Sequence, residues 1–168
     1  MAGDDDENGG NEKTMYSDKI NVNILTSLMV AHGVTTVVIC PGSRNAPLAH
    51  NFASCPDMYC VAATDERSAG FYALGLALVS EHPVAGSALL NLAPAVAEAY
   101  YREVPLLVIS ADRPLAMINQ LQGQTLPQVG ALGAMVKASM QLPEPHDDLE
   151  RWHCNRMVNE ALLTLRSH

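Results

Sequence analysis

The first place where this chain could do chemistry is Glu66, an acidic residue that opens a helical pattern directly after a strand-like run, Tyr59 to Ala63. In the stretch Thr64 to Leu78 (TDERSAGFYALGLAL), small residues recur from Glu66 at helical spacing: Ala69, Gly70, Ala73 and Ala77. This spacing predicts that the Glu66 carboxylate begins the buried stripe of the helix, where a charge is costly. Ala and Gly in place of Leu let another backbone or a flat ligand approach closely, which suggests a cofactor.

A second interpretation of the same residues is an ordinary helix start, because acids near a helix N-terminus interact favourably with its dipole. That interpretation predicts that Asp65 and Glu66 are both exposed. The buried stripe predicts instead that Glu66 points inward and that Asp65 caps the helix. The exposure of Glu66 distinguishes the two.

The segment PGSRNAP places a Pro-Gly turn after an apolar run, with Ser43 and Arg44 in front of a helix start. Backbone N–H groups, a hydroxyl and a guanidinium together can bind a carboxylate or a phosphate. The alternative is an ordinary strand-to-helix turn with Arg44 in solvent. The chain contains neither GxGxxG nor a Walker sequence, which disfavours a dinucleotide site and a P-loop.

A third polar turn, SADRP, follows the apolar run Leu106 to Ser110. Its Asp112 and Arg113 could form a local ion pair or clamp a substrate. Its sequence alone does not choose between them.

Apolar, strand-like runs alternate with helical patterns along the chain, which predicts an α/β fold: a doubly wound parallel sheet with helices on both faces. The predicted strands are Thr35 to Ile39, Tyr59 to Ala63, a short one from His82 to Ala85, Leu106 to Ser110, and one within Val136 to Leu142. The predicted helices are one capped by Ser17 and stopped by Gly33, one near Pro47 to Ala53, the helix at Glu66, one from Ala88 to about Tyr101, and a closing helix from Asp147 or Asp148. Ligands of such sheets bind at the carboxyl ends of the strands, so the three polar turns should share one rim.

Length and charge limit the possible functions. The chain has 168 residues, enough for one domain with a core. Half of its net charge of −8 lies in Met1 to Thr14, and the remaining −4 disfavours partners such as nucleic acid and anionic membrane surfaces. No apolar run approaches the roughly 20 residues that span a bilayer. The acidic stretch Met1 to Thr14 predicts a disordered leader or an appended tag before a natural start at Met15, leaving 15–168 as the domain.

The four cysteines, Cys40, Cys55, Cys60 and Cys154, have no CxxC spacing. Free thiols in a reduced, cytoplasmic setting are therefore expected. His153 and Cys154 are not predicted to bind a metal, because adjacent residues of a helix point in different directions.

Four segments, in order, resemble the pyrimidine-binding domain of thiamine-diphosphate enzymes: PGSRNAPL, TDERSAGFYALGLA, ALLNLAPAVAEA and ISADRP. More narrowly, the chain from about Met15 onward is similar to the N-terminal domain of the 2-succinyl-5-enolpyruvyl-6-hydroxy-3-cyclohexene-1-carboxylate synthases of menaquinone biosynthesis. The resemblance implies the thiamine-diphosphate-binding fold and a transferase with thiamine diphosphate as cofactor. Such a carboligase decarboxylates 2-oxoglutarate and adds the resulting succinyl carbanion to isochorismate.

The resemblance also implies roles for individual residues. Glu66 would be catalytic, through a hydrogen bond to N1′ of the cofactor's aminopyrimidine. Pro41 and Asn91 would line the cofactor pocket. The residues matching isochorismate contacts are Ser43, Arg44, Arg113 and Gln124, with Gln120 and Gln122 as alternatives to Gln124.

Two departures from the family carry predictions. The family's diphosphate-binding domain, with a GDG…N element that holds Mg²⁺ or Mn²⁺, has no counterpart here. The chain is therefore interpreted as an inactive fragment of a longer homodimeric or homotetrameric enzyme, whose cofactor would also contact the diphosphate-binding domain of a neighbouring subunit. In addition, the short stretch from Val84 to Ala88 predicts that residues are missing between Ala85 and Gly86.

Two other functions stay open at this point. One is another thiamine-diphosphate decarboxylase or carboligase, similar to acetolactate synthase. The two arginine turns argue against it, because a small neutral acceptor has no anionic groups for them to bind. The other is a noncatalytic assembly module, in which the Ala- and Gly-rich helix serves a helix-to-helix interface. Loss of turnover on replacing Glu66 would separate an enzyme from an assembly module.

Overall fold

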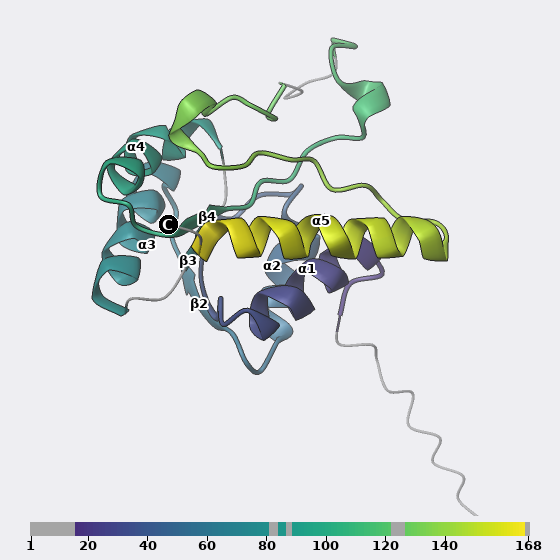
Figure 1. The fold of residues 1–168 in the computed structure, drawn as a ribbon, viewed down its shortest axis with the longest axis horizontal. Helices are drawn as coiled ribbons and strands as arrows, with labels where there is room; N and C mark the ends of the chain where they lie inside the picture. Colours follow the sequence, from purple (N-terminus) through teal and green to yellow (C-terminus); the bar gives the residue numbers. More distant parts are fainter. Residues whose placement is uncertain (1–15, 81–83, 87–88, 122–126, 167–168) are drawn as a thin grey trace, which may run out of the picture.

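A computed structural model of the chain describes residues 16–80, 84–86, 89–121 and 127–166 (Figure 1). The predicted leader, Met1 to Thr14, lies outside these ranges, as do two candidate substrate residues, Gln122 and Gln124.

The described chain forms a four-stranded parallel sheet with the strand order β2-β1-β3-β4. The strands are β1 (Thr36–Ile39), β2 (Tyr59–Ala62), β3 (Val84–Gly86) and β4 (Leu106–Val108). The helices are α1 (Ile20–Ala31), α2 (Ala46–Ser54), α3 (Glu66–Ser80), α4 (Ala93–Tyr101) and α5 (Asp148–Arg166), with 3₁₀ turns η1 (Leu90–Leu92), η2 (Leu115–Met117) and η3 (Gly133–Met135). The predicted doubly wound α/β fold is confirmed.

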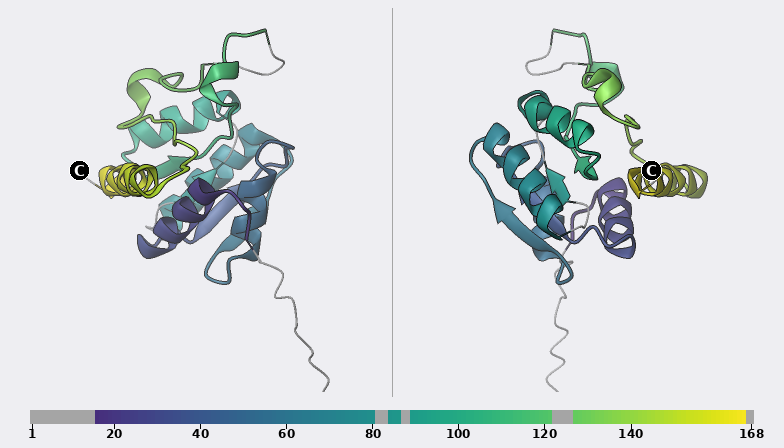
Figure 2. Two further views of the ribbon diagram at one scale, coloured as in Figure 1. Left: turned by 90° about the vertical axis from the view of Figure 1, so that its right-hand side faces the viewer. Right: turned by 60° about the vertical axis from the view of Figure 1, so that its left-hand side comes forward.

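Helices cover both faces of the sheet (Figure 2). Val37 packs in a core cluster with α1, α2 and α5, whereas the next residue, Val38, packs in another cluster with α3. Because successive side chains of a strand point to opposite faces, both must be apolar when both faces are covered. This explains the continuous apolar run of β1.

The end of α1 follows the prediction, but its start does not. Gly33 has a φ of 73°, its N–H donates to the Val30 carbonyl, and the Val34 N–H donates to the Met29 carbonyl, as in a Schellman motif. Ser17 was predicted as the cap, but the N-cap is Lys19, which makes no side-chain capping bond. The prediction for Ser17 is wrong, because Ser17 lies two residues before the N-cap.

Two other expectations are corrected. The helix predicted from Ala88 is α4, which begins only at Ala93 after the 3₁₀ turn η1. No strand forms within Val136 to Leu142 in the described chain. Ala85 and Gly86 both belong to β3 and pair in consecutive register with Leu107 and Val108, and the omission of residues between them stays a prediction.

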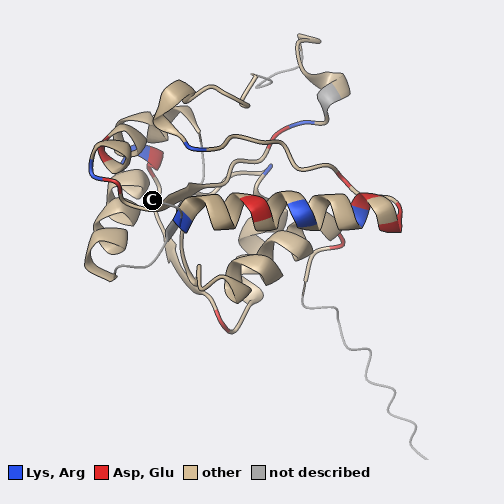
Figure 3. Ribbon diagram, viewed as in Figure 1, with Lys and Arg blue, Asp and Glu red and all other residues tan. Residues whose placement is uncertain are grey.

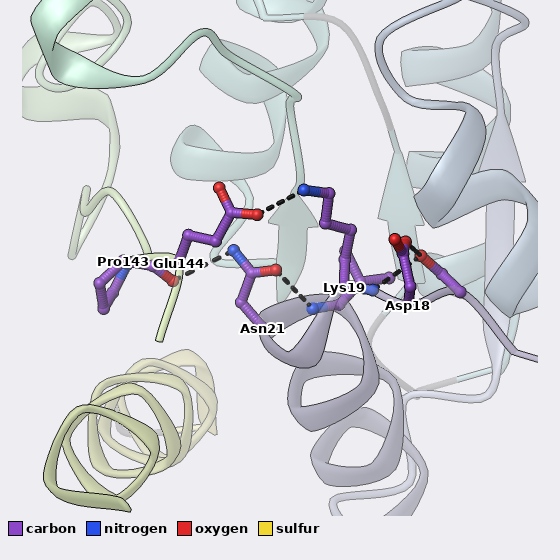
Figure 4. Close-up of polar contacts among 7 residues, drawn as sticks. Asp18, Lys19, Asn21, Pro143 and Glu144 are labelled. Atoms are coloured by element: carbon purple, nitrogen blue, oxygen red, sulfur yellow. Dashed lines mark hydrogen bonds and ion pairs between the residues drawn. The ribbon is translucent and has the colours of Figure 1, made fainter. Parts of the chain in front are cut away.

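The segment before α5 is attached to α1 by side chains instead of joining the sheet. The Asn21 amide donates to the Pro143 carbonyl over 3.1 Å, and Lys19 forms an ion pair with Glu144 (Figure 4). These contacts hold Pro143 and Glu144, directly after Val136 to Leu142, against the start of α1.

The Lys19–Glu144 pair gives a testable pH effect. The hydrogen bond and charge of Lys19 lower the pKa of the Glu144 carboxyl. Its stabilising contribution is therefore present above the unfolded pKa of glutamate and is lost as the pH falls through the lower folded pKa. We expect Glu144→Gln to lower the thermal midpoint slightly at pH 7 and by progressively less as the pH falls, with the difference also shrinking in about 1 M salt. A midpoint difference that stays constant from pH 7 into the acid range would contradict this.

A buried polar network joins α1 to α2. Asn51 is 0% exposed; its carbonyl oxygen accepts from the Ser17 N–H over 2.7 Å, and its amide donates to Asn23 over 2.7 Å. Buried amides are tolerated where both ends are hydrogen-bonded. Asn51 therefore fixes the chain entering α1 against α2.

The directions of His153 and Cys154 on α5 and the free state of the cysteines agree with the sequence analysis. Charged side chains mark α5, whereas α3 carries none after Arg67 (Figure 3). On α5, His153 is exposed while Cys154 is buried, so the two point in different directions. All four cysteines are free, as predicted.

Candidate active site

Glu66 and Asn91 meet at the carboxyl end of the sheet. Glu66 is the first residue of α3, just after β2, and Asn91 lies in η1, after β3. The Asn91 amide donates to Glu66 Oε2 over 3.2 Å. The structure thus joins two residues that were predicted on the cofactor side from separate segments.

The helix start at Glu66 combines features of both sequence interpretations. Glu66 is half-buried, between the buried state of one interpretation and the exposed state of the other, and the fully buried stripe begins at Ala69. Asp65 is confirmed as the cap, because its carboxylate accepts from the Ser68 N–H over 2.8 Å and from the Ser68 hydroxyl over 2.7 Å. Since Asp65 satisfies the helix end, the Glu66 carboxylate is available for other partners.

The cap at Asp65 gives a second testable effect. Hydrogen bonds from the Ser68 hydroxyl and N–H lower the pKa of Asp65. The stabilisation by this carboxylate is present above the unfolded pKa of aspartate and is lost as the pH falls through the folded pKa. We expect Asp65→Ala to lower the thermal midpoint at pH 7. Asp65→Asn should retain most of the capping stabilisation, because the asparagine side-chain oxygen can also accept from the helix N–H groups. Equal losses in both variants would contradict the capping role.

The small residues of α3 serve helix packing. A Cβ on Gly70 would lie 2.8 Å from the Ala95 Cβ and 2.8 Å from Leu92 Cδ2, so η1 and α4 already occupy the space beside it. Of the two predicted neighbours of the small residues, another backbone or a flat ligand, the structure shows another segment of the chain beside Gly70. The close approach holds η1, and with it Asn91, next to the start of α3.

The first arginine turn, after β1, is held by its own asparagine. The Asn45 amide donates to the Cys40 carbonyl over 2.6 Å, across the turn that contains Ser43 and Arg44. Ser43 and Pro41 are exposed, and Arg44 is half-buried. The turn is therefore fixed while its hydroxyl stays accessible.

The second arginine turn, after β4, presents Arg113. The Arg113 N–H donates to Asp112 Oδ1 over 2.7 Å, and the Arg113 side chain is exposed. The salt bridges of the described residues do not include Arg113, which disfavours the local ion pair predicted as one alternative. Its guanidinium can therefore meet an anion from outside the turn.

Both arginine turns line one open cavity of about 1570 Å³ that extends along β4 and α5. Its rim residues include Ser43, Arg44, Asp112 and Arg113. Glu66, Asn91 and Pro41 do not line it. Of the candidate glutamines, Gln120 is described and exposed, and it does not line the cavity either. The predicted residues thus form two groups after the carboxyl ends of the parallel strands, the cavity lined by both arginine turns and the Glu66–Asn91 pair.

Two amide side chains at this rim escaped the sequence analysis. Asn45 was included in the first turn without a role, and Gln128 was not among the candidate residues. Gln128 is half-buried and bonds to Ser110 and Ala111. A polar residue that closes a loop has no periodic signal, and only its position after a Gln-rich stretch could have pointed to it.

The described chain offers no cluster of three or more His, Cys, Asp or Glu side chains that could hold a metal ion. None of its helices, over the same residues, is long and apolar enough to cross a membrane.

Comparison with known proteins identifies the fold and family. Residues 22–132 match the family model "Thiamine pyrophosphate enzyme, N-terminal TPP binding domain". A solved thiamine diphosphate-dependent 4-hydroxybenzoylformate decarboxylase of Rhodococcus jostii superposes with a TM-score of 0.69 at 22% identity, covering 84% of this chain and 27% of that one. A putative thiamin diphosphate-dependent enzyme of Mycobacterium smegmatis superposes with a TM-score of 0.64 at 22% identity, over 74% of this chain and 25% of that one. At this identity the two structures support the fold alone.

Curated relatives are much more similar in sequence. A Bacteroides fragilis protein named 2-succinyl-5-enolpyruvyl-6-hydroxy-3-cyclohexene-1-carboxylate synthase is 60% identical over 159 residues, covering 92% of this chain. A Porphyromonas gingivalis protein of the same name is 46% identical over 153 residues, covering 88% of this chain. The chain spans 29% of the first relative and 26% of the second. With the family model matched over most of its described length, the chain belongs to the thiamine pyrophosphate enzyme family, as an N-terminal TPP-binding domain.

Proposed function

We propose that this chain is the pyrimidine-binding domain of a longer carboligase, a 2-succinyl-5-enolpyruvyl-6-hydroxy-3-cyclohexene-1-carboxylate synthase of menaquinone biosynthesis. The observation that carries the proposal is the pairing of Glu66 with Asn91 after the carboxyl ends of parallel strands, the same sheet edge from which the two arginine turns follow. Relatives of that name match nearly the whole chain and support the assignment.

The Glu66–Asn91 pair fits thiamine diphosphate. Glu66 Oε2 accepts from Asn91, and the carboxylate is half-buried, so it retains lone pairs for a ring N–H. In this proposal Glu66 holds a proton at N1′ of the aminopyrimidine, Asn91 orients the carboxylate, and Pro41 lines the pocket. The bound cofactor supplies the nucleophilic carbon that reacts with a 2-oxo acid. A metal ion, Mg²⁺ or Mn²⁺, would be held by a domain outside this chain.

The arginine cavity fits a dianionic acceptor. Isochorismate carries two carboxylates, and guanidinium groups bind carboxylates through paired, charge-assisted hydrogen bonds. Arg44 and Arg113 would bind these groups, with the exposed Ser43 hydroxyl donating beside them. Gln124 is retained as the proposed glutamine contact. The donor substrate would be 2-oxoglutarate.

The proposal includes a cytoplasmic homodimer or homotetramer whose neighbouring subunit supplies the diphosphate-binding domain. The outer face of α3 supports a protein partner, since Phe71 is 46%, Tyr72 51% and Val79 87% exposed. A helix that is apolar on every side is usually covered in the functional assembly.

The test uses the full-length enzyme with 2-oxoglutarate and isochorismate. We expect the wild type to form the carboligation product and Arg113→Ala to raise the KM for isochorismate about tenfold, as expected for losing a charge-assisted hydrogen bond. Arg113→Lys should recover only part of this loss. As a matched control, Arg102→Ala should leave the KM for isochorismate unchanged, because Arg102 pairs with Glu98 at the surface, next to the end of α4. If the enzyme instead joins two pyruvate molecules and ignores isochorismate, the acetolactate synthase-like alternative is correct.

A further inference from the structure

The geometry points to Gln128 as a positioning residue that aims the Arg113 turn at the acceptor. This inference rests on the proposed function, in which Arg113 binds isochorismate. Gln128 itself need not touch the substrate.

Gln128 bonds to the two residues where β4 gives way to the turn. The Ser110 hydroxyl donates to Gln128 Oε1, and Gln128 Nε2 donates to the Ala111 carbonyl over 3.2 Å. A single carboxamide thus uses its acceptor and its donor on consecutive residues. Because both bonds start from one planar group, they restrain the orientation of the backbone at Ala111 as well as its position.

The turn continues directly from this anchor to the guanidinium. Asp112 follows Ala111, and its Oδ1 accepts from the Arg113 N–H over 2.7 Å. Gln128, Ser110, Asp112 and Arg113 all line the same cavity. Gln128 and Ser110 are half-buried, whereas Arg113 is exposed, so the anchor lies beneath the group that would meet the ligand.

The carboxamide is the chemical requirement of this anchor. Leucine has a similar size but no hydrogen-bonding atoms. Glutamate keeps the acceptor for Ser110, but its oxygen would face the Ala111 carbonyl with no proton between them. Each half-buried group left without a partner costs free energy, so both substitutions should loosen the turn.

The decisive experiment measures both KM values and kcat of the full-length enzyme for Gln128→Leu, Gln128→Glu and Ser110→Ala. We expect both Gln128 variants to raise the KM for isochorismate by about five- to tenfold, with Ser110→Ala smaller, from the usual strength of one or two hydrogen bonds. The KM for 2-oxoglutarate should stay within about twofold, a change too small to reflect a lost hydrogen bond. Asn155→Leu is the matched control, since Asn155 is an exposed amide on α5 that does not line the cavity, and all constants of this variant should stay unchanged.

A merely structural role would lower kcat through loss of folded enzyme, or raise both KM values alike, and either result would overturn the inference. Hydrogen exchange of the Arg113 amide provides a readout independent of activity, and it should be several-fold faster in Gln128→Leu than in Asn155→Leu. Should the wild type fail to use isochorismate, the proposed function fails, and equal exchange in the two variants would then reject the positioning role as well.

Discussion

Replacing Glu66 by Gln in the full-length enzyme should reduce kcat by about a thousandfold, within the range of 10²–10⁴ typical of a lost acid–base group. The substitution keeps the size of the side chain and an oxygen that can accept from Asn91. It removes the negative charge that the proposal places beside N1′ of the aminopyrimidine. The loss should therefore appear in turnover, measured at saturating substrates, with the KM for isochorismate nearly unchanged.

Glu98→Gln provides the control for this loss. Glu98 lies on α4 and pairs with Arg102 at the surface, so its replacement removes the same charge away from the rim. We expect normal turnover from Glu98→Gln and similar thermal midpoints for both variants. Full activity in Glu66→Gln would favour the noncatalytic assembly module.

Gly70→Ala should lower the free energy of unfolding of this chain by about 2 kcal/mol, from two opposing effects. Alanine is better than glycine in a helix interior by about 1 kcal/mol. Overpacking costs about 1–3 kcal/mol, and here it should reach the upper end or exceed it. The added Cβ would lie 2.8 Å from the Ala95 Cβ, which is attached directly to the α4 backbone and has no flexible end that could move aside.

Gly75→Ala is the matched substitution on the same helix. A Cβ at Gly75 would meet nothing within 4 Å, so only the gain in helix propensity remains, about 0.5–1 kcal/mol. Urea denaturation of the two variants measures both effects. If both substitutions stabilise the chain, the close packing of α3 on α4 is not as described.

The repeating features of the fold could be predicted from the sequence. The run Thr35 to Ile39 indicated a strand buried on both faces, and Val37 and Val38 do face different core clusters. Gly33 ends α1 because the turn after the helix requires a positive φ, which glycine adopts without steric cost. These signals are local, since apolar period and turn chemistry act within a few residues.

Features that depend on distant partners were not predictable. The segment Val136 to Leu142 has apolar residues typical of a strand, but contacts of Asn21 and Lys19 with Pro143 and Glu144 hold the adjoining chain. The Ala and Gly stripe of α3 is compatible with either a ligand or a packed helix. In the structure, Leu92 and Ala95 pack against it at Gly70.

In the candidate site, too, local features could be predicted from the sequence, whereas features that depend on distant contacts could not. Asp65 could be predicted as a cap from its position, and Glu66 and Asn91 were predicted on one side through family resemblance. Their contact, and the half-buried state of Glu66, depend on how closely η1 approaches α3. Gln128 reaches Ala111 across 17 positions, a distance that no local pattern reports.

The most direct test of the account is the structure of the full-length enzyme with thiamine diphosphate bound, read at one distance. We predict that a Glu66 carboxylate oxygen lies about 2.6–3.2 Å from N1′ of the aminopyrimidine, as in a hydrogen bond, with Asn91 still donating to the same carboxylate. An aminopyrimidine bound elsewhere, with Glu66 turned into bulk solvent, would contradict the account.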